Sequence, residues 1–102
     1  MYRDRHGESV PTRREGRDIK KYMFYIYILK SEVDGSFYTG QCQNIQERVL
    51  RHNNGYTKST KAKRPWQMVY YESYNTRSEA IIREIQIKKM KSRKYINELI
   101  SQ

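Results

Sequence analysis

Residues 22–40 read Tyr-Met-Phe-Tyr-Ile-Tyr-Ile-Leu-Lys-Ser-Glu-Val-Asp-Gly-Ser-Phe-Tyr-Thr-Gly, and this stretch decides the fold. Its first part, residues 22–29, is rich in aromatic and β-branched residues, which favours a strand. Asp34-Gly35 predicts a turn because both residue types tolerate a positive φ, and residues 36–40 return to an extended pattern. We therefore expect two antiparallel strands joined by a hairpin turn.

The two-residue period of a strand divides the first run into two faces. One face carries Phe24, Ile26 and Ile28, and the other carries Tyr25, Tyr27 and Leu29. A single tyrosine in such a run most often packs its ring in the core while its hydroxyl reaches solvent at the edge of the core. Tyr27 and Tyr38 become candidates for chemistry only through the pattern further along the chain.

Composition narrows the class of partner. The chain has 102 residues, which suits one small domain, and a mean hydropathy of −1.06. The formal net charge is +10, of which residues 1–21 contribute +3 and residues 22–102 contribute +7. A basic folded body favours an anionic partner such as nucleic acid, although a solvated lysine-rich surface is the plain alternative.

Cysteine usage and hydropathy exclude several classes of protein. Cys42 is the only cysteine, which excludes an intramolecular disulfide framework and a zinc site built from several cysteines. No run approaches the length of a membrane-spanning helix, and the amino terminus lacks the apolar segment of a signal peptide. We therefore expect a cytoplasmic protein with no membrane partner.

Residues 1–21 differ from the rest of the chain. They are polar and charged, contain Pro11 and two glycines, and show no sustained apolar period. This composition predicts a disordered basic extension ahead of a domain at residues 22–102. Met23 stands directly before the strand pattern, so a translation start at that position is an alternative.

Capping signals place a first helix. Asn44 followed by Glu47 resembles a capping box, and Asn54-Gly55 predicts the end of the helix near residue 53. Arg48 and His52 are four residues apart and therefore share one helical face. The plain interpretation of that pair is a solvated basic surface.

A third strand and two more helices complete the expected fold. Residues 66–73 predict the strand, and a second capping box at Thr76 and Glu79 opens a helix over residues 77–90. The expected apolar stripe of that helix comprises Ile81, Ile85 and the edge from Ala80 to Ile87. Ser92 caps a last helix ending near residue 100, packed through Tyr95, Ile96 and Leu99. The order β-β-α-β-α-α predicts an α+β fold, a three-stranded antiparallel sheet flanked by helices.

Two polar features stand out from this plan. Residues 56–65 form a loop with four positive charges and three Ser or Thr hydroxyls, which suits phosphate but equally suits an exposed connection. Glu84 lies beside the apolar stripe, where a carboxylate is costly unless it is paired or coordinating; an ion pair with Lys88 is the plain alternative. The candidate nucleic-acid contacts are Arg51, Lys58, Lys61, Lys63, Arg64 and Lys88.

Together these motifs resemble the GIY-YIG endonuclease superfamily, in particular small stand-alone bacterial members similar to the nuclease domain of an excision-repair subunit. Residues 25–27, Tyr-Ile-Tyr, stand where Gly-Ile-Tyr is expected, and residues 38–40, Tyr-Thr-Gly, where Tyr-Ile-Gly is expected. Residues 44–55 look like the segment with an arginine and a following His-Asn-x-Gly. Residues 77–88 are similar to the segment with the metal-binding glutamate.

The chain also departs from the family pattern. Tyr25 replaces the first glycine, Thr39 replaces the central isoleucine of the second triplet, and Cys42 lies where threonine is common. Asn97 lies near the place of the family's distal polar residue, but that role is not carried over to it. The resemblance nevertheless covers about residues 22–100.

The resemblance implies metal-assisted hydrolysis of DNA phosphodiester bonds. Glu84 would hold one Mg²⁺ or Mn²⁺. Arg48 would clamp phosphate oxygens. Tyr27 would be the general base, made a phenolate by nearby positive charge. Tyr38 and His52 are second candidates for the proton transfer.

Two alternative functions remain open from the sequence. One is a basic nucleic-acid-binding module of the same fold without cleavage, and another is a ribosome-associated factor using the same surface on RNA. DNA, including structured or branched DNA as in DNA repair, is favoured over RNA because charge alone does not explain the Tyr, Arg and Glu set. Cutting both strands of a duplex would call for a second copy, so a homodimer is a separate expectation about the oligomeric state.

Overall fold

The computed structural model describes residues 23–102, and its centre is a three-stranded antiparallel sheet. The strands are β1 (Phe24–Ser31), β2 (Phe37–Cys42) and β3 (Trp66–Tyr74). Their order across the sheet is β2-β1-β3, so β1 is the central strand. The hairpin between β1 and β2 turns at Gly35, whose φ of 74° is the positive value that the Asp-Gly pair predicts.

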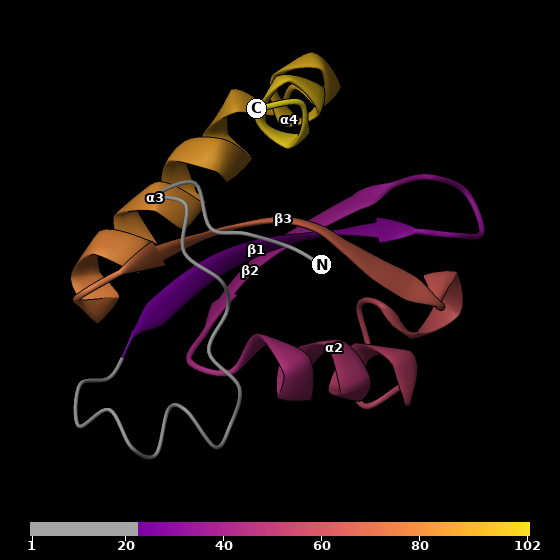
Figure 1. Ribbon diagram of the computed structural model, residues 1–102. Coiled ribbons are helices and arrows are strands. Elements are labelled where there is room, and N and C mark those ends of the chain that lie inside the picture. The colour runs from indigo at the N-terminus through magenta and orange to yellow at the C-terminus, as the bar shows by residue number, and fades with distance from the viewer. Residues whose placement is uncertain (1–22) are drawn as a thin grey trace.

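Helices cover both faces of the sheet. The helices are α2 (Ile45–Asn53), α3 (Arg77–Met90) and α4 (Arg93–Ile100), with a short 3₁₀ turn η1 (Lys61–Lys63) before β3. Helix α2 lies on one side of the sheet, and α3 and α4 lie on the other (Figure 1). The predicted α+β architecture and the order β-β-α-β-α-α are confirmed.

The alternation predicted for β1 is confirmed by the two cores. Tyr25, Tyr27 and Leu29 are buried in the core under α2, together with Ile45. Ile26 and Ile28 are buried in the second core, together with Ala80 and Ile87 of α3 and Leu99 of α4. The central strand therefore separates a tyrosine-rich core from an isoleucine-rich one.

Strand boundaries differ slightly from those expected. Strand β1 ends at Ser31 instead of residue 29, and β2 runs on to Cys42. The reason is the ladder itself, because Gln41 and Cys42 still pair with residues 26 and 25 of β1. Only two residues therefore link β2 to α2. The extension predicted at residues 1–21 and the strand start predicted at residue 22 lie outside the described residues.

Helix α3 begins and ends where predicted, and of the predicted apolar stripe only the edge from Ala80 to Ile87 is buried. Ala80 and Ile87 are buried, whereas Ile81 is 36% exposed and Ile85 is 56% exposed. The inward direction is set partly by Arg83, whose guanidinium reaches Glu72 of β3 at 2.9 Å. The expectation that Ile81 and Ile85 pack inward is therefore wrong.

The helix starts follow the predicted caps. The Asn44 side chain accepts from Glu47 N at 3.0 Å, Thr76 and Glu79 form a reciprocal capping box, and Ser92 caps α4. Within residues 23–102, none of the helices combines the length and the apolar character needed to cross a bilayer.

Candidate functional site

A chain of hydrogen bonds runs through the core under α2. The Tyr27 hydroxyl of β1 lies 3.0 Å from His52 Nε2 of α2. The opposite ring nitrogen, His52 Nδ1, lies 2.7 Å from Thr60 Oγ1. Tyr27, His52 and Thr60 are all buried. The fold thus joins a phenol, an imidazole and an alcohol that are 25 and 8 residues apart in the chain.

The direction of these bonds can be assigned from their last member. Thr60 Oγ1 donates to the Thr57 carbonyl oxygen at 3.3 Å, so it is free to accept from His52 Nδ1–H. Nε2 is then the unprotonated nitrogen and accepts from the Tyr27 hydroxyl. This assignment makes the imidazole neutral and leaves Nε2 as the proton acceptor of the chain.

Gly40 explains why Tyr27 can lie where it does. Residues 27 and 40 are direct partners across β1 and β2. A Cβ at Gly40 would lie 2.6 Å from the Tyr27 hydroxyl oxygen and 2.7 Å from its ring carbon Cζ. The phenol ring therefore occupies the space that the Cβ of any other residue at position 40 would fill. This is the physical reason for the glycine at the end of Tyr-Thr-Gly.

Burial controls the protonation of the chain. Burial, together with the neighbouring Tyr38 and Cys42, raises the pKa of Tyr27 well above its ordinary value, and the nearby Arg48 only partly offsets the rise. Burial and the positive charges of Arg48 and Arg51 lower the pKa of His52. The expected phenolate at Tyr27 is therefore disfavoured, and the site holds a neutral phenol and a neutral imidazole.

Tyr38 completes the aromatic wall of the site. Its ring centre lies 5.0 Å from that of His52 in an edge contact, 6.4 Å from Tyr27 and 6.3 Å from Trp66. Unlike Tyr27, Tyr38 is only partly buried. The structure therefore brings Tyr27, Tyr38, Arg48 and His52 together, with Tyr38 the more exposed of the two phenols.

The loop after α2 is held in place by contacts that the sequence did not reveal. Trp66 Nε1 donates to the Thr60 carbonyl oxygen at 2.8 Å. The Asn53 side chain accepts from Trp66 N at 2.6 Å and donates to the Trp66 carbonyl oxygen at 3.0 Å. Trp66, which follows the loop, is thus hydrogen-bonded both to Asn53 at the end of α2 and to Thr60 within the loop. The sequence marks Thr60 only as one of the loop hydroxyls, because no local pattern identifies it as the partner of His52.

Most of the predicted phosphate contacts gather on this side of the sheet. Arg51 comes from α2 and the others from the following loop, and all are exposed: Arg51, Lys58, Lys61, Lys63 and Arg64. Lys63 Nζ also lies 3.4 Å from an Asp34 carboxylate oxygen of the hairpin turn, in an exposed pair. The sixth candidate, Lys88, lies on α3.

Glu84 comes from the other side of the sheet. It lies on α3, its side chain is 18% exposed, and one carboxylate oxygen lies 2.9 Å from Lys88 Nζ. Arg77 lies seven residues earlier, on nearly the same flank, and donates to Gln43 Oε1, just past the end of β2, at 3.4 Å. Glu84 therefore lies on a helix that packs against the face of the sheet opposite Tyr27, Tyr38 and His52, and its ion-pair partner in the described residues is Lys88.

Among residues 23–102 there is no cluster of three or more His, Cys, Asp or Glu side chains able to hold a metal ion. A divalent ion at Glu84 would therefore have one carboxylate and would complete its coordination with water and substrate oxygens. That donor set fits Mg²⁺, which retains several waters and commonly bridges a single carboxylate to phosphate.

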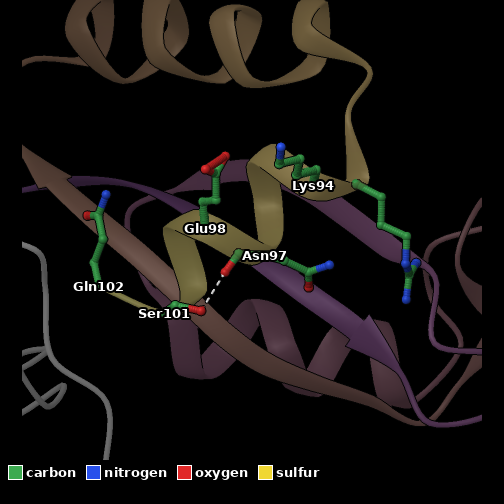
Figure 2. Close-up of a pocket in the computed structure, with 6 residues that line it drawn as sticks. Lys94, Asn97, Glu98, Ser101 and Gln102 are labelled. Atoms are coloured by element: carbon green, nitrogen blue, oxygen red, sulfur yellow. Dashed lines mark hydrogen bonds between the residues drawn. The ribbon is translucent and has the colours of Figure 1, made fainter.

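Asn97 lies away from this site. It is on the exposed side of α4, where it lines a shallow hollow with Lys94, Glu98 and Ser101 (Figure 2). The Ser101 hydroxyl donates to the Asn97 backbone carbonyl at 2.8 Å, so the contact within this hollow is local to the helix. Nothing in this geometry assigns Asn97 a role beside Tyr27.

Comparison with protein families matches residues 23–97 to the GIY-YIG catalytic domain. The chain belongs to the GIY-YIG family. It is 48% identical over 79 residues to a UPF0213 protein of Staphylococcus saprophyticus, covering 76% of this chain and 94% of that protein. A UPF0213 protein of Staphylococcus epidermidis is 49% identical over 65 residues, covering 63% of this chain and 78% of the relative.

A solved structure agrees with this assignment. The solution NMR structure of a UPF0213 protein from Bacillus halodurans is 31% identical and superposes with a TM-score of 0.51. The match covers 78% of this chain and 83% of that chain. GIY-YIG domains are endonuclease domains that act on nucleic acid and generally use a divalent metal. The chain therefore has a nuclease-type fold, as the sequence resemblance implied.

Proposed function

We propose that this protein is a metal-dependent endonuclease that hydrolyses DNA phosphodiester bonds, using Tyr27, Tyr38, Arg48 and His52 from the α2 side of the sheet and Glu84 from α3. The observation that carries the proposal is the buried Tyr27–His52–Thr60 chain. An ordered imidazole whose acceptor nitrogen faces a phenol, beside an arginine and an array of exposed cations, supplies the groups that phosphate hydrolysis needs.

Each side chain has a role that follows from its position. Arg48 binds non-bridging phosphate oxygens through its permanently charged fork. Tyr38, the more exposed phenol, orients the phosphate or the attacking water. Tyr27 stays neutral: its oxygen receives the water's proton as its own proton moves to His52 Nε2, so no free phenolate forms.

Glu84 is the residue that would hold the divalent ion. When bound, that ion supplies Lewis-acid stabilisation of the negative charge that develops on the phosphate. The exposed cations of α2 and its loop add affinity that is independent of sequence and weakens steeply with salt. Arg51, Lys58, Lys61, Lys63 and Arg64 carry this part of binding.

A second function is favoured by one observation. Glu84 is paired with Lys88 at 2.9 Å, so its charge already has a partner within α3. If that pair persists, the protein is a basic nucleic-acid-binding module of the same fold that does not cut. Replacing Lys88 with Gln removes the competing ammonium and keeps the helix, because both residues are good helix formers.

The test incubates supercoiled and branched DNA with Mg²⁺ or Mn²⁺ and wild type, Glu84→Gln or Lys88→Gln. We expect cleavage by wild type, a loss of about 10²-fold or more for Glu84→Gln, and retained or increased cleavage for Lys88→Gln. Glu98→Gln, which alters an exposed carboxylate on α4, is the matched control and should cut normally. DNA binding by all four without cleavage by any would establish the binding module instead.

A further inference from the structure

Tyr56 is an exposed aromatic residue in the loop after α2, the helix that carries Arg48 and His52. It exposes 71% of its surface, whereas every other aromatic residue in the described part of the chain is buried or partly buried. It lies three residues beyond the end of α2 and opens the loop that carries Lys58, Lys61 and Arg64. An exposed ring among cations does not stabilise the apolar core. We therefore expect it to contact a binding partner.

The backbone that presents Tyr56 is held in place. Tyr56 N donates to the Arg51 carbonyl oxygen at 3.0 Å, and Gly55 N donates to the His52 carbonyl oxygen at 3.2 Å. Gly55 has a φ of 80°, which lets the chain leave α2 sharply. The ring therefore projects from a backbone that is tied to the same residue, His52, that anchors the buried proton chain.

Cations from the far end of the loop lie against this point. A Cβ at Gly55 would lie 2.0 Å from Arg64 Nη1 and 3.4 Å from Lys61 Cγ. Gly55 thus leaves space in which the Arg64 guanidinium lies close to the backbone next to Tyr56. The aromatic ring of Tyr56 and the side chains of Arg64 and Lys61 therefore lie around the same point of the loop, next to the end of α2.

We infer that Tyr56 is a stacking platform for an unpaired base, so that the DNA bound here has a single-stranded segment or a flipped-out base next to the phosphate held by Arg48. An aromatic side chain stacks on a base only where that base is not already stacked within a duplex. The neighbouring cations bind the backbone on either side of the stacked base. This inference rests on the proposed function because it names the kind of DNA that the same site takes.

The experiment measures binding in EDTA, so that it needs no cleavage. Wild type, Tyr56→Phe and Tyr56→Leu are titrated against a single-stranded oligonucleotide containing 2-aminopurine and against a long blunt duplex of the same sequence. Stacking on an aromatic ring contributes about 1–3 kcal/mol per base, which corresponds to roughly 5- to 150-fold in Kd. We expect a loss in that range for Tyr56→Leu on the single strand only, together with loss of 2-aminopurine quenching. Tyr56→Phe should stay within about twofold of wild type.

Two control variants separate stacking from charge and from general surface effects. Lys58→Gln should weaken binding to single strand and duplex alike and reduce the slope of log K against log salt by about 0.7–0.9. Val33→Ala, which shortens an exposed apolar residue on the hairpin, should change neither. An equal loss on both DNA forms for Tyr56→Leu, or no loss on either, would overturn the inference.

The same variants distinguish this inference from the proposed function. Stacking by a wild-type protein that cuts no DNA supports the platform and overturns the nuclease. Cleavage by wild type, with Tyr56→Leu equal to wild type in binding and quenching, overturns the platform alone.

Discussion

The two faces of the sheet each bury a polar network, and the networks differ in charge. Under α3 and α4, the Glu72 carboxylate receives Arg83 Nε at 2.9 Å and Nη2 at 3.1 Å, as well as the hydroxyls of Tyr70 and Tyr74. Arg83 in turn donates to the Tyr95 hydroxyl at 2.9 Å. Under α2, the Tyr27–His52–Thr60 chain is made of neutral groups.

This difference separates a charge-paired network from the network that we propose to be reactive. Burial would raise the pKa of Glu72, but the hydrogen bonds from Arg83 and the two tyrosines hold it below its ordinary value, so the pair stays charged and balanced. Within residues 23–102, His52 forms no hydrogen bond with a carboxylate, and the neighbouring Arg48 and Arg51 form no salt bridge. A balanced pair holds α3 to β3, whereas unbalanced cations next to a proton acceptor suit an anionic substrate.

The largest effect is expected from breaking the balanced network. Glu72→Gln leaves the Arg83 guanidinium partly buried without its counter-charge, and we expect a loss of about 3–5 kcal/mol in the free energy of unfolding. Urea denaturation measures the loss. Glu98→Gln on the surface of α4 should stay within about 0.5 kcal/mol. If Glu72→Gln abolished cleavage but left unfolding unchanged, the Glu72–Arg83 network would not be purely structural.

The next largest effect is expected from filling the space beneath Tyr27. Gly40→Ala places a methyl group against the phenol ring, and overpacking of this kind costs about 3 kcal/mol where neither partner can move. A double-mutant cycle with Tyr27→Leu isolates the clash, because the substituted side chain is shorter than the phenol. An equal cost for Gly40→Ala in both backgrounds would show that Tyr27 is not what requires glycine.

A smaller effect is expected from removing the end of the neutral chain. Thr60→Val keeps the shape but leaves His52 Nδ1 buried without a partner, at a cost of about 1–2 kcal/mol. We also expect the His52 tautomer to become mixed, which ¹⁵N NMR shifts of the imidazole report. Thr60→Ser keeps the hydroxyl and should preserve the tautomer. A single unchanged tautomer in Thr60→Val would mean that Thr60 does not position His52.

The smallest effect is the pH dependence of stability. Because the folded-state pKa of His52 lies below its ordinary value of 6.5, the unfolded chain binds a proton first as the pH falls. The stabilisation from neutral His52 is therefore present above pH 6.5 and is lost as the pH falls towards the folded-state pKa, by at most about 1.4 kcal/mol per pH unit. His52→Gln should flatten this dependence in urea titrations, and His6 is common to both proteins. Parallel profiles would show that His52 is not held neutral.

Local chemistry was enough to predict the elements of the fold. The alternation along residues 24–29, the Asp-Gly turn and the caps at Asn44, Thr76 and Ser92 all depend on neighbours within a few residues, and each was confirmed. The sequence was also enough to propose four candidate site residues. Motif spacing places them on a hairpin and on one helical face: Tyr27, Tyr38, Arg48 and His52.

Only the tertiary structure decided which of these residues touch and in what state. The expected stripe on α3 combined Ile81 and Ile85 with the edge from Ala80 to Ile87, and the reach of Arg83 to Glu72 helps to explain why only that edge is buried. In the sequence Thr60 resembles any other loop hydroxyl, and only the fold places it next to His52. The sequence also allows a phenolate at Tyr27, but burial in the fold favours the neutral phenol. Caps and periods act over a few residues and can be read along the chain, whereas burial and long-range hydrogen bonds exist only once distant segments have packed together.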